Sequence, residues 1–168
     1  MSQPAEERNR TEADLLEDFK LTGFVPYLLN QAMSRLDNNL RIALKPFDLS
    51  VHQWRVLFMI RLNGPQSIGD ISAGTVMGQS TITRVADQLE KAGLASRAPM
   101  ENNNRVVLLS LTESGEEMIR KVIPHTFAIH DGAIEDMDAA EQQQLFQLLR
   151  KLAASLRRHE AKQRFESV

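Results

Sequence analysis

Residues 78–93, in the middle of the chain, read GQSTITRVADQLEKAG. The apolar residues of this segment recur at spacings of three and four, which places them on one narrow stripe of a helix. The stripe consists of Ile82, Val85, Ala86 and Leu89. The other side carries short polar side chains and one arginine, and acidic residues occur only near the end, at Asp87 and Glu90. The pattern predicts a helix with one buried and one polar face.

The polar face of this helix has two interpretations. An ordinary amphipathic surface helix would show the same stripe. A helix whose N-terminus enters a DNA groove also needs short donors and a cation in its first turns, without carboxylates, because phosphates repel negative charge. Residues 79–84 meet this second requirement. The neighbouring sequence decides between the two.

A strong helix start precedes the segment. Ser50 and Gln53 form a capping box, while Leu49 and Trp54 stand at the two positions of a hydrophobic staple. The predicted helix runs to about Leu62, where an Asn-Gly-Pro turn follows.

A second, shorter helix is predicted next. Ser67 and Asp70 repeat the capping pattern, and the helix continues to about Ala73. A turn over residues 74–78 then leads into the polar helix. Two short helices joined by a tight turn form a helix-turn-helix pattern.

After Gly93 the period changes from helical to alternating. Residues 94–98 and 105–111 predict two strands, joined by the asparagine-rich residues 99–104. The second strand is predicted to place on one face Val107, Leu109 and Leu111. A helix-turn-helix followed at once by a hairpin is a winged helix.

Long helices are predicted on both sides of the winged helix. One begins at Val25 and is closed by Pro46; another begins at Thr112 and is expected to bend at Pro124; the last begins at Asp138 with a capping box. The first and last carry long apolar stripes, formed by Val25, Leu28, Leu29, Ala32, Leu36, Leu40 and Ala43, and by Leu145, Leu148, Leu149, Leu152 and Leu156.

The fold class is therefore mainly α with a small β hairpin. The 168 residues are 42% apolar and 25% charged, which is typical of a folded domain, and we expect residues 1–168 to form one domain. Its parts are a tail and N-terminal helix (1–44), a winged helix-turn-helix lobe (45–111) and C-terminal helices (112–168). Residues 11–20 also predict a short acidic helix.

Charge is distributed unevenly along the chain. The formal net charge of −2 divides into −3 for residues 1–40, +3 for residues 41–105 and −2 for residues 106–168. Only the segment with the winged helix is cationic, a weak signal for a nucleic-acid partner. The chain has no cysteine, no apolar run of membrane-spanning length and no targeting pattern at its start, so we expect a soluble, cytoplasmic protein.

Catalytic and metal motifs are missing from the sequence. It has no glycine-rich phosphate loop, nucleophile elbow or HExxH motif, so we expect neither an enzyme nor a cofactor. His125 and His130 are five residues apart without a nearby thiolate, and we expect no metal site there.

Four segments resemble the multiple antibiotic resistance regulator (MarR) family of bacterial winged-helix repressors in order and spacing. They are LSVHQWRVLFMI, NGP, STITRVADQLEKAGLASR and LLSLTESG, between residues 49 and 115. The resemblance implies a homodimer with interlocked N- and C-terminal helices, whose two reading helices bind an imperfect palindrome in double-stranded DNA. The apolar stripes agree, because they are longer than one lobe can cover.

The resemblance also assigns DNA contacts. Phosphate and base contacts fall to Gln66, Ser67, Gln79, Ser80, Thr81, Thr83 and Arg84, and minor-groove contacts to Asn102, Asn103, Asn104 and Arg105. In the family an aspartate commonly stands two residues before the wing arginine, often with a basic residue between them. Asn103 and Asn104 occupy those positions here, so Arg105 loses an orienting ion pair and the wing loses a phosphate contact.

Family members often release DNA when they bind phenolic or other aromatic acids, which implies a repressor controlled by a small ligand. Candidate pocket residues are Phe24, Tyr27, Met33, Arg35, His52, Trp54, Arg55 and Met59. Most of them are expected to be plain core residues, Trp54 among them as a staple and core residue, whereas His52 is expected to be a solvated residue of a first helical turn. The alternative function is a winged helix that serves as a protein-interaction or assembly module without sequence-specific DNA binding. Such a module needs an apolar or acidic face at residues 79–84.

Overall fold

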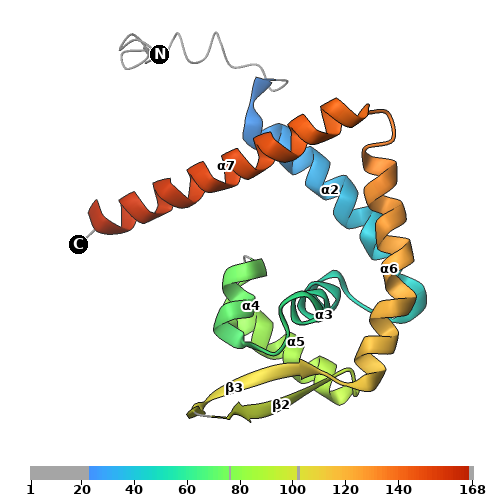
Figure 1. Ribbon diagram of the computed structural model, residues 1–168, viewed down its shortest axis with the longest axis vertical. Helices are drawn as coiled ribbons and strands as arrows, with labels where there is room; N and C mark the ends of the chain where they lie inside the picture. Colours follow the sequence, from blue (N-terminus) through green and yellow to red (C-terminus); the bar gives the residue numbers. More distant parts are fainter. Residues whose placement is uncertain (1–22, 76, 102, 167–168) are drawn as a thin grey trace. The chain divides into compact units, whose positions relative to one another are not determined.

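The computed structural model describes residues 23–75, 77–101 and 103–166 (Figure 1). The chain divides into two compact units, residues 1–122 and 123–168. Helix α6 (Glu113–Ala133) runs from the first unit into the second, and α7 (Ala139–Glu166) belongs to the second. The other elements, all in the first unit, are α2 (Val25–Leu44), the 3-10 helix η3 (Lys45–Phe47), α3 (Val51–Asn63), β1 (Gln66–Ser67), α4 (Ile68–Thr75), α5 (Gln79–Lys91), β2 (Ala95–Met100) and β3 (Asn103–Leu111). The predicted helix over residues 11–20 lies outside the described residues.

Local capping interactions define the helix boundaries. The box at α3 is confirmed: the Gln53 N–H donates to Ser50 Oγ at 3.2 Å, and the Ser50 N–H donates to Gln53 Oε1 at 2.8 Å. Ser67 and Asp70 bond reciprocally at the start of α4, which reaches Thr75 rather than Ala73. These bonds satisfy backbone donors that a helix leaves without partners in its first turn.

The end of α5 is a Schellman motif. Gly93 has a φ of +71°, the left-handed conformation that glycine adopts without a steric penalty. The Gly93 N–H donates to the Glu90 carbonyl, and the Leu94 N–H donates to the Leu89 carbonyl, both at 2.9 Å. The prediction that the helix ends at Gly93 is therefore confirmed. After this motif the chain continues directly into β2.

The sheet has three antiparallel strands in the order β1-β3-β2. Strand β1, which sequence reasoning missed, pairs Gln66 with Leu109 and Ser67 with Leu108. A strand of two residues has no alternation to detect. Helices α3, α4 and α5 gather on one side of this sheet (Figure 1). Element order and pairing are those of a winged helix-turn-helix.

The β2–β3 hairpin is longer than predicted. The strands reach Met100 and begin again at Asn103, so residues 99–104 are not the open connection we expected. Pro99 is tolerated because β2 is an edge strand, and a register shift follows it. The predicted apolar face of the second strand is only partly covered: Leu109 is buried, whereas Val107, which lies beyond the β3 residues that pair with β1, is 44% exposed.

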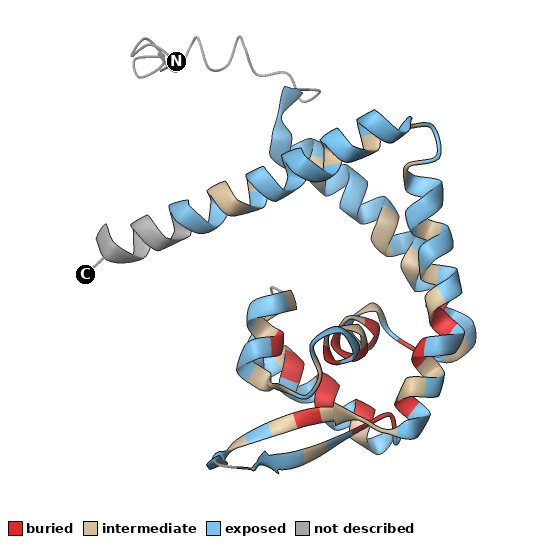
Figure 2. Cartoon of the chain, in the orientation of Figure 1, coloured by how far each residue is buried: buried red, intermediate tan, exposed pale blue. Residues whose placement is uncertain are grey.

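The buried residues of the first unit form one core (Figure 2). Helix α3 contributes Val56, Leu57 and Ile60, while α4 contributes Ile71. The rest comes from the end of α2, the segment before α3, the first turn of α3, α5, Leu94 with the strands, and α6, namely Leu44, Leu49, Trp54, Ile82, Val85, Ala86, Leu89, Leu94, Ala95, Leu109, Ile119 and Val122. This core holds α5 by its apolar side.

The second unit contains the later part of α6 and all of α7. Helix α6 continues through Pro124, where the expected bend stays a prediction. The predicted capping box at Asp138 is confirmed, since the Glu141 N–H donates to Asp138 Oδ1 and the Asp138 N–H donates to Glu141 Oε2, both at 2.9 Å. None of the described side chains from residue 123 to residue 159 is buried. The described helices also include none with the length and apolarity of a membrane span.

Candidate nucleic-acid interface

The polar face of α5 is oriented by its apolar stripe. Ile82, Val85, Ala86 and Leu89 are at most 2% exposed, as the sequence predicts. Since a helix turns by about 100° per residue, burial of this stripe places Ser80, Arg84 and Asp87 on the opposite, outward side. The fold therefore presents the predicted reading face to solvent.

The N-terminus of α5 differs from those of the other helices of the lobe. Gly78 stands at the N-cap, with extended backbone angles and no side chain that could accept a hydrogen bond. Helices α3 and α4, in contrast, carry reciprocal side-chain caps. Uncapped N–H groups and the positive end of the helix dipole favour an anion such as a phosphate.

The predicted reading residues lie together on the first two turns of α5. Gln79, Ser80, Thr83 and Arg84 are exposed, and Thr81 is half-buried. The Thr83 hydroxyl donates to the Gln79 carbonyl at 2.9 Å, within the helix. In the described part of the chain, the Arg84 guanidinium has no hydrogen-bond or ion-pair partner. Its donors are available to a phosphate or to a guanine edge.

Gln66 and Ser67 lie at some distance in sequence from these residues but belong to the same lobe. Both are half-buried in β1. The Ser67 hydroxyl donates to Asp70 Oδ2 at 2.6 Å, and its backbone N–H bonds the same carboxylate oxygen at 3.3 Å. Ser67 therefore fixes the start of α4. Its hydroxyl and its backbone N–H already bond the Asp70 carboxylate, so a phosphate would have to compete with that carboxylate for them.

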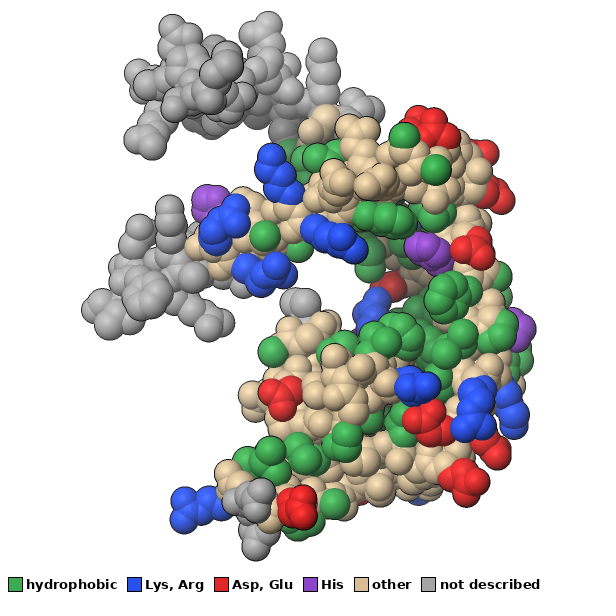
Figure 3. Space-filling view, in the orientation of Figure 1, with side chains coloured by type: hydrophobic (Ala, Val, Ile, Leu, Met, Phe, Trp, Pro, Cys, Tyr) green, Lys and Arg blue, Asp and Glu red, His purple; other side chains and the backbone are tan. Residues whose placement is uncertain are grey.

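The hairpin carries the predicted wing residues. Asn103 and Arg105 are exposed, Asn102 lies outside the described residues, and nothing is described for the side chain of Asn104. The Arg105 N–H donates to Asn103 Oδ1 at 3.2 Å, so this asparagine braces the backbone, and among the described residues the guanidinium has no ion pair. A basic side chain projects at the outer end of the hairpin in Figure 3.

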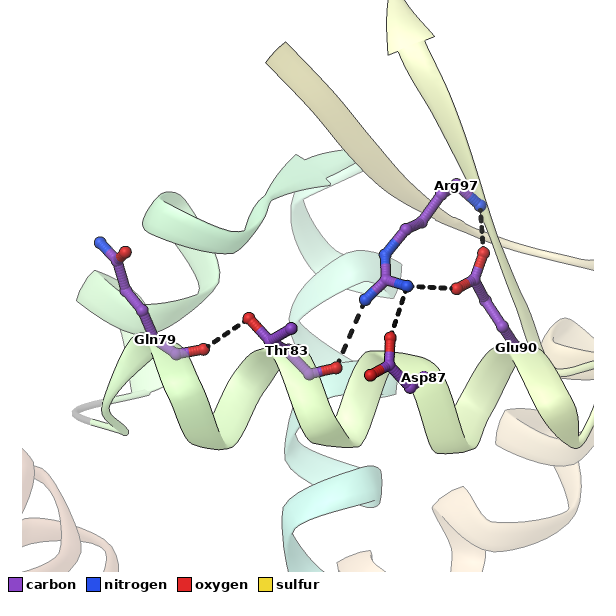
Figure 4. A network of polar contacts seen from close by, with 5 residues as sticks. All are labelled: Gln79, Thr83, Asp87, Glu90 and Arg97. Atoms are coloured by element: carbon purple, nitrogen blue, oxygen red, sulfur yellow. Dashed lines mark hydrogen bonds and ion pairs between the residues drawn. The ribbon is translucent and has the colours of Figure 1, made fainter. Parts of the chain in front are cut away.

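Sequence reasoning missed Arg97, which links β2 to α5 (Figure 4). Its Nη1 donates to Asp87 Oδ1 at 2.6 Å and to Glu90 Oε2 at 2.5 Å. Its Nη2 donates to the Thr83 carbonyl at 3.3 Å, and its backbone N–H donates to Glu90 Oε1 at 3.1 Å. The spacing of Thr83, Asp87 and Glu90 along one helix face was the signal available in the sequence.

The candidate pocket residues are more scattered. Trp54 is 5% exposed and stacks on Phe58 at 5.4 Å between ring centroids, so it belongs to the core. Arg55 pairs with Asp37 at 2.6 Å, an ion pair that joins α3 to α2. Met59 is half-buried, and the exposed residues of the set are Phe24, Tyr27, Met33, Arg35 and His52.

Two open cavities occur in the first unit. One of about 760 Å³ lies at the α2–α3 turn and is lined by Arg41, Ile42, Lys45, Asp48, Leu49, Ser50, Gln53 and Gln88. The other, of about 570 Å³, lies along α2 and is lined by Asn30, Gln31, Ser34, Arg35, Asn38 and Asn39. Of the eight candidate pocket residues, only Arg35 lines either of these two cavities.

Known proteins with this architecture regulate transcription. The model of the MarR family matches residues 49–107. The HTH-type transcriptional repressor IacR of Pseudomonas putida is 30% identical over 133 residues, which cover 79% of this chain and 80% of that protein. A MarR-family regulator from Silicibacter pomeroyi has a crystal structure similar to this one, with a TM-score of 0.74, 29% identity and coverage of 87% of this chain and 96% of that chain.

A third similarity concerns the fold alone. The structure of BpsR from Bordetella bronchiseptica, which addresses the regulation of its DNA binding by 6-hydroxynicotinic acid, gives a TM-score of 0.74 at 24% identity, over 80% of this chain and 96% of that chain.

Because a repressor is related over most of both sequences and the winged helix matches the family model, this chain belongs to the MarR family of DNA-binding transcription regulators and is not an enzyme.

Proposed function

We propose that the protein is a homodimeric repressor that binds an imperfect palindrome in DNA and is released by a small ligand of the aromatic-acid type. The observation that carries the DNA-binding part is the first two turns of α5, where an uncapped N-terminus adjoins the exposed Arg84. This face is neither apolar nor acidic at residues 79–84, so it does not fit an interaction module without DNA binding.

The apolar surface that one chain leaves uncovered supports the proposed dimer. In α2, Val25 is 48% exposed and Leu28 is 44% exposed; in α7, Leu148 and Leu156 are both 54% exposed. Apolar side chains stand uncovered on the surface in Figure 3. A second copy of the chain would remove this surface from water and would bring a second α5 to the same DNA.

Arg84→Ala tests the reading role of α5. We expect affinity for a specific DNA fragment from the protein's own promoter region to fall about 5- to 150-fold, because a good base contact contributes about 1 to 3 kcal/mol. Fluorescence anisotropy with labelled duplex DNA, at one fixed salt concentration, measures the change.

Arg120→Ala is the matched control, because Arg120 is an exposed arginine on α6 of the same unit and has no ion pair among the described residues. Its affinity should stay within about twofold of the wild type. If Arg84→Ala also stayed within that range, the role of Arg84 would be wrong. If the wild-type protein bound no fragment specifically, the interaction-module alternative would replace the DNA-binding proposal.

The effector is proposed by likeness to regulators such as BpsR, whose DNA binding is regulated by an aromatic acid. We expect 6-hydroxynicotinic acid or a related aromatic acid to raise the melting temperature and to weaken DNA binding. Arg35→Ala should reduce this thermal shift, since an exposed arginine can bind the carboxylate, whereas Arg120→Ala, at an exposed arginine that lines neither cavity, should retain it. A ligand that stabilises the protein but leaves its DNA affinity unchanged would contradict release by that ligand.

A further inference from the structure

Arg97 is the described residue whose side chain joins the hairpin to the reading helix by ion pairs. It comes from β2, where it faces Leu109 of β3, and its side chain is 27% exposed. Both carboxylates that it contacts belong to α5. Because β2 pairs with the strand that carries Arg105, the guanidinium connects the predicted wing contact to the predicted reading helix.

The geometry of the contact restricts α5 over two turns. Thr83, Asp87 and Glu90 follow one another at spacings of four and three, so they lie along one side of the helix. The Arg97 guanidinium reaches all three, and the Arg97 backbone N–H adds a fourth bond, to the second oxygen of Glu90 (Figure 4). A planar guanidinium with several bonds of fixed direction holds its partners more closely than a single point charge does.

The same contact changes the charge of the reading face. Asp87 lies three residues after Arg84, and side chains at this spacing on a helix are neighbours that can form an ion pair. In the structure the Asp87 carboxylate pairs with Arg97 instead, while Arg84 has no ion pair among the described residues. Without Arg97, the free Asp87 carboxylate could bind Arg84 or repel a phosphate that approaches α5.

We propose that Arg97 is a positioning residue for DNA recognition: it binds Asp87 and so leaves Arg84 free for DNA, and it holds the hairpin against α5. This inference rests on the proposed DNA-binding function. It goes beyond that function because Arg97 itself need not touch the DNA. Its effect must then depend on both Asp87 and Arg84.

The test is a set of double-mutant cycles on specific DNA affinity. We expect Arg97→Ala to weaken binding about tenfold, and Asp87→Asn in the same chain to restore it to within about threefold of Asp87→Asn alone. In an Arg84→Ala background, the further loss caused by Arg97→Ala should shrink to about twofold or less, because the cation that Asp87 would capture is gone. A purely structural role of Arg97 would not produce this dependence.

Two further variants keep the cycles interpretable. Arg61→Ala removes the ion pair to Glu116 at 3.1 Å, which joins α3 to α6 and involves no residue of α5 or the hairpin, so it should leave DNA affinity within about twofold. Arg97→Lys keeps the charge but lacks the fork, so it should give a smaller loss that Asp87→Asn again relieves. Thermal unfolding of each protein shows whether it folds. If Arg97→Ala does not fold, Arg97→Lys takes its place in the cycles.

The outcomes separate the two levels of the proposal. If wild-type protein bound no DNA specifically, the proposed function would fail and the role of Arg97 with it. If the wild type bound but Arg97→Ala or Arg97→Lys had unchanged affinity, only the role of Arg97 would be overturned. A loss of affinity that Asp87→Asn did not relieve, and that Arg84→Ala did not diminish, would likewise overturn it.

Discussion

Replacement of Gly115 by alanine is expected to lower the free energy of unfolding by about 1 to 3 kcal/mol, the usual cost of forcing an additional group into a packed interior. Gly115 is buried near the start of α6, where a Cβ would lie 2.0 Å from the Leu94 carbonyl oxygen. Such a contact is far inside van der Waals distance, so part of the backbone must move.

Neither side of this contact can move freely. The Leu94 N–H completes the Schellman motif at the end of α5, and the Leu94 carbonyl accepts the Thr112 N–H at 3.2 Å. The Gly115 N–H in turn donates to Thr112 Oγ1, which caps α6, at 3.1 Å. A shift of either segment therefore breaks hydrogen bonds that connect the reading helix, the hairpin and α6.

Chemical denaturation of Gly115→Ala and Gly132→Ala measures this effect with an internal control. Gly132 lies in the same helix, and no heavy atom is within 4 Å of its Cβ position, so alanine there should stabilise the helix by up to about 1 kcal/mol. Equal stabilities of the two variants would show that the close approach of α6 to Leu94 is not what requires a glycine.

Replacement of Leu149 by glutamate is expected to convert the proposed dimer into monomers. Leu149 is 42% exposed in one chain and belongs to the apolar stripe of α7. Burial of a leucine contributes about 1.5 to 3 kcal/mol, and a symmetric dimer contains the substitution twice, so the dissociation constant should rise at least about 100-fold. Sedimentation velocity at several protein concentrations measures the change.

Gln147→Glu provides the matched control, because it adds the same charge two residues away, on the side of α7 opposite Leu149. It should remain a dimer, and it should bind the palindrome like the wild type. We expect Leu149→Glu to bind the palindrome much more weakly, since one chain engages a single half-site. A dimeric Leu149→Glu would show that α7 is not the dimer contact.

The helix boundaries illustrate how much could be predicted from sequence. The boxes at Ser50 and Asp138 and the stop at Gly93 were correct because each involves residues only a few positions apart. The buried stripe of α5 was correct for the same reason, since helical periodicity alone places its four apolar residues on one side.

The errors have a common cause in contacts between distant segments. Strand β1 was missed because it exists only where Gln66 and Ser67 meet Leu109 and Leu108 of β3. The length of the hairpin depends on cross-strand hydrogen bonds between β2 and β3. Pro99 is compatible with this pairing only because β2 is an edge strand. None of these contacts has a period that a sequence window can detect.

By itself, then, the sequence determined the order of the helices, their caps, the polar face of α5 and the family to which the chain belongs. Only the tertiary structure decided how the charges on that face are paired. Asp87 has Arg84 and Lys91 as helical neighbours, yet it pairs with Arg97, which comes near only because β2 turns back along α5. Ion pairs depend on distances in space, and sequence spacing fixes those distances only within one helix or one turn.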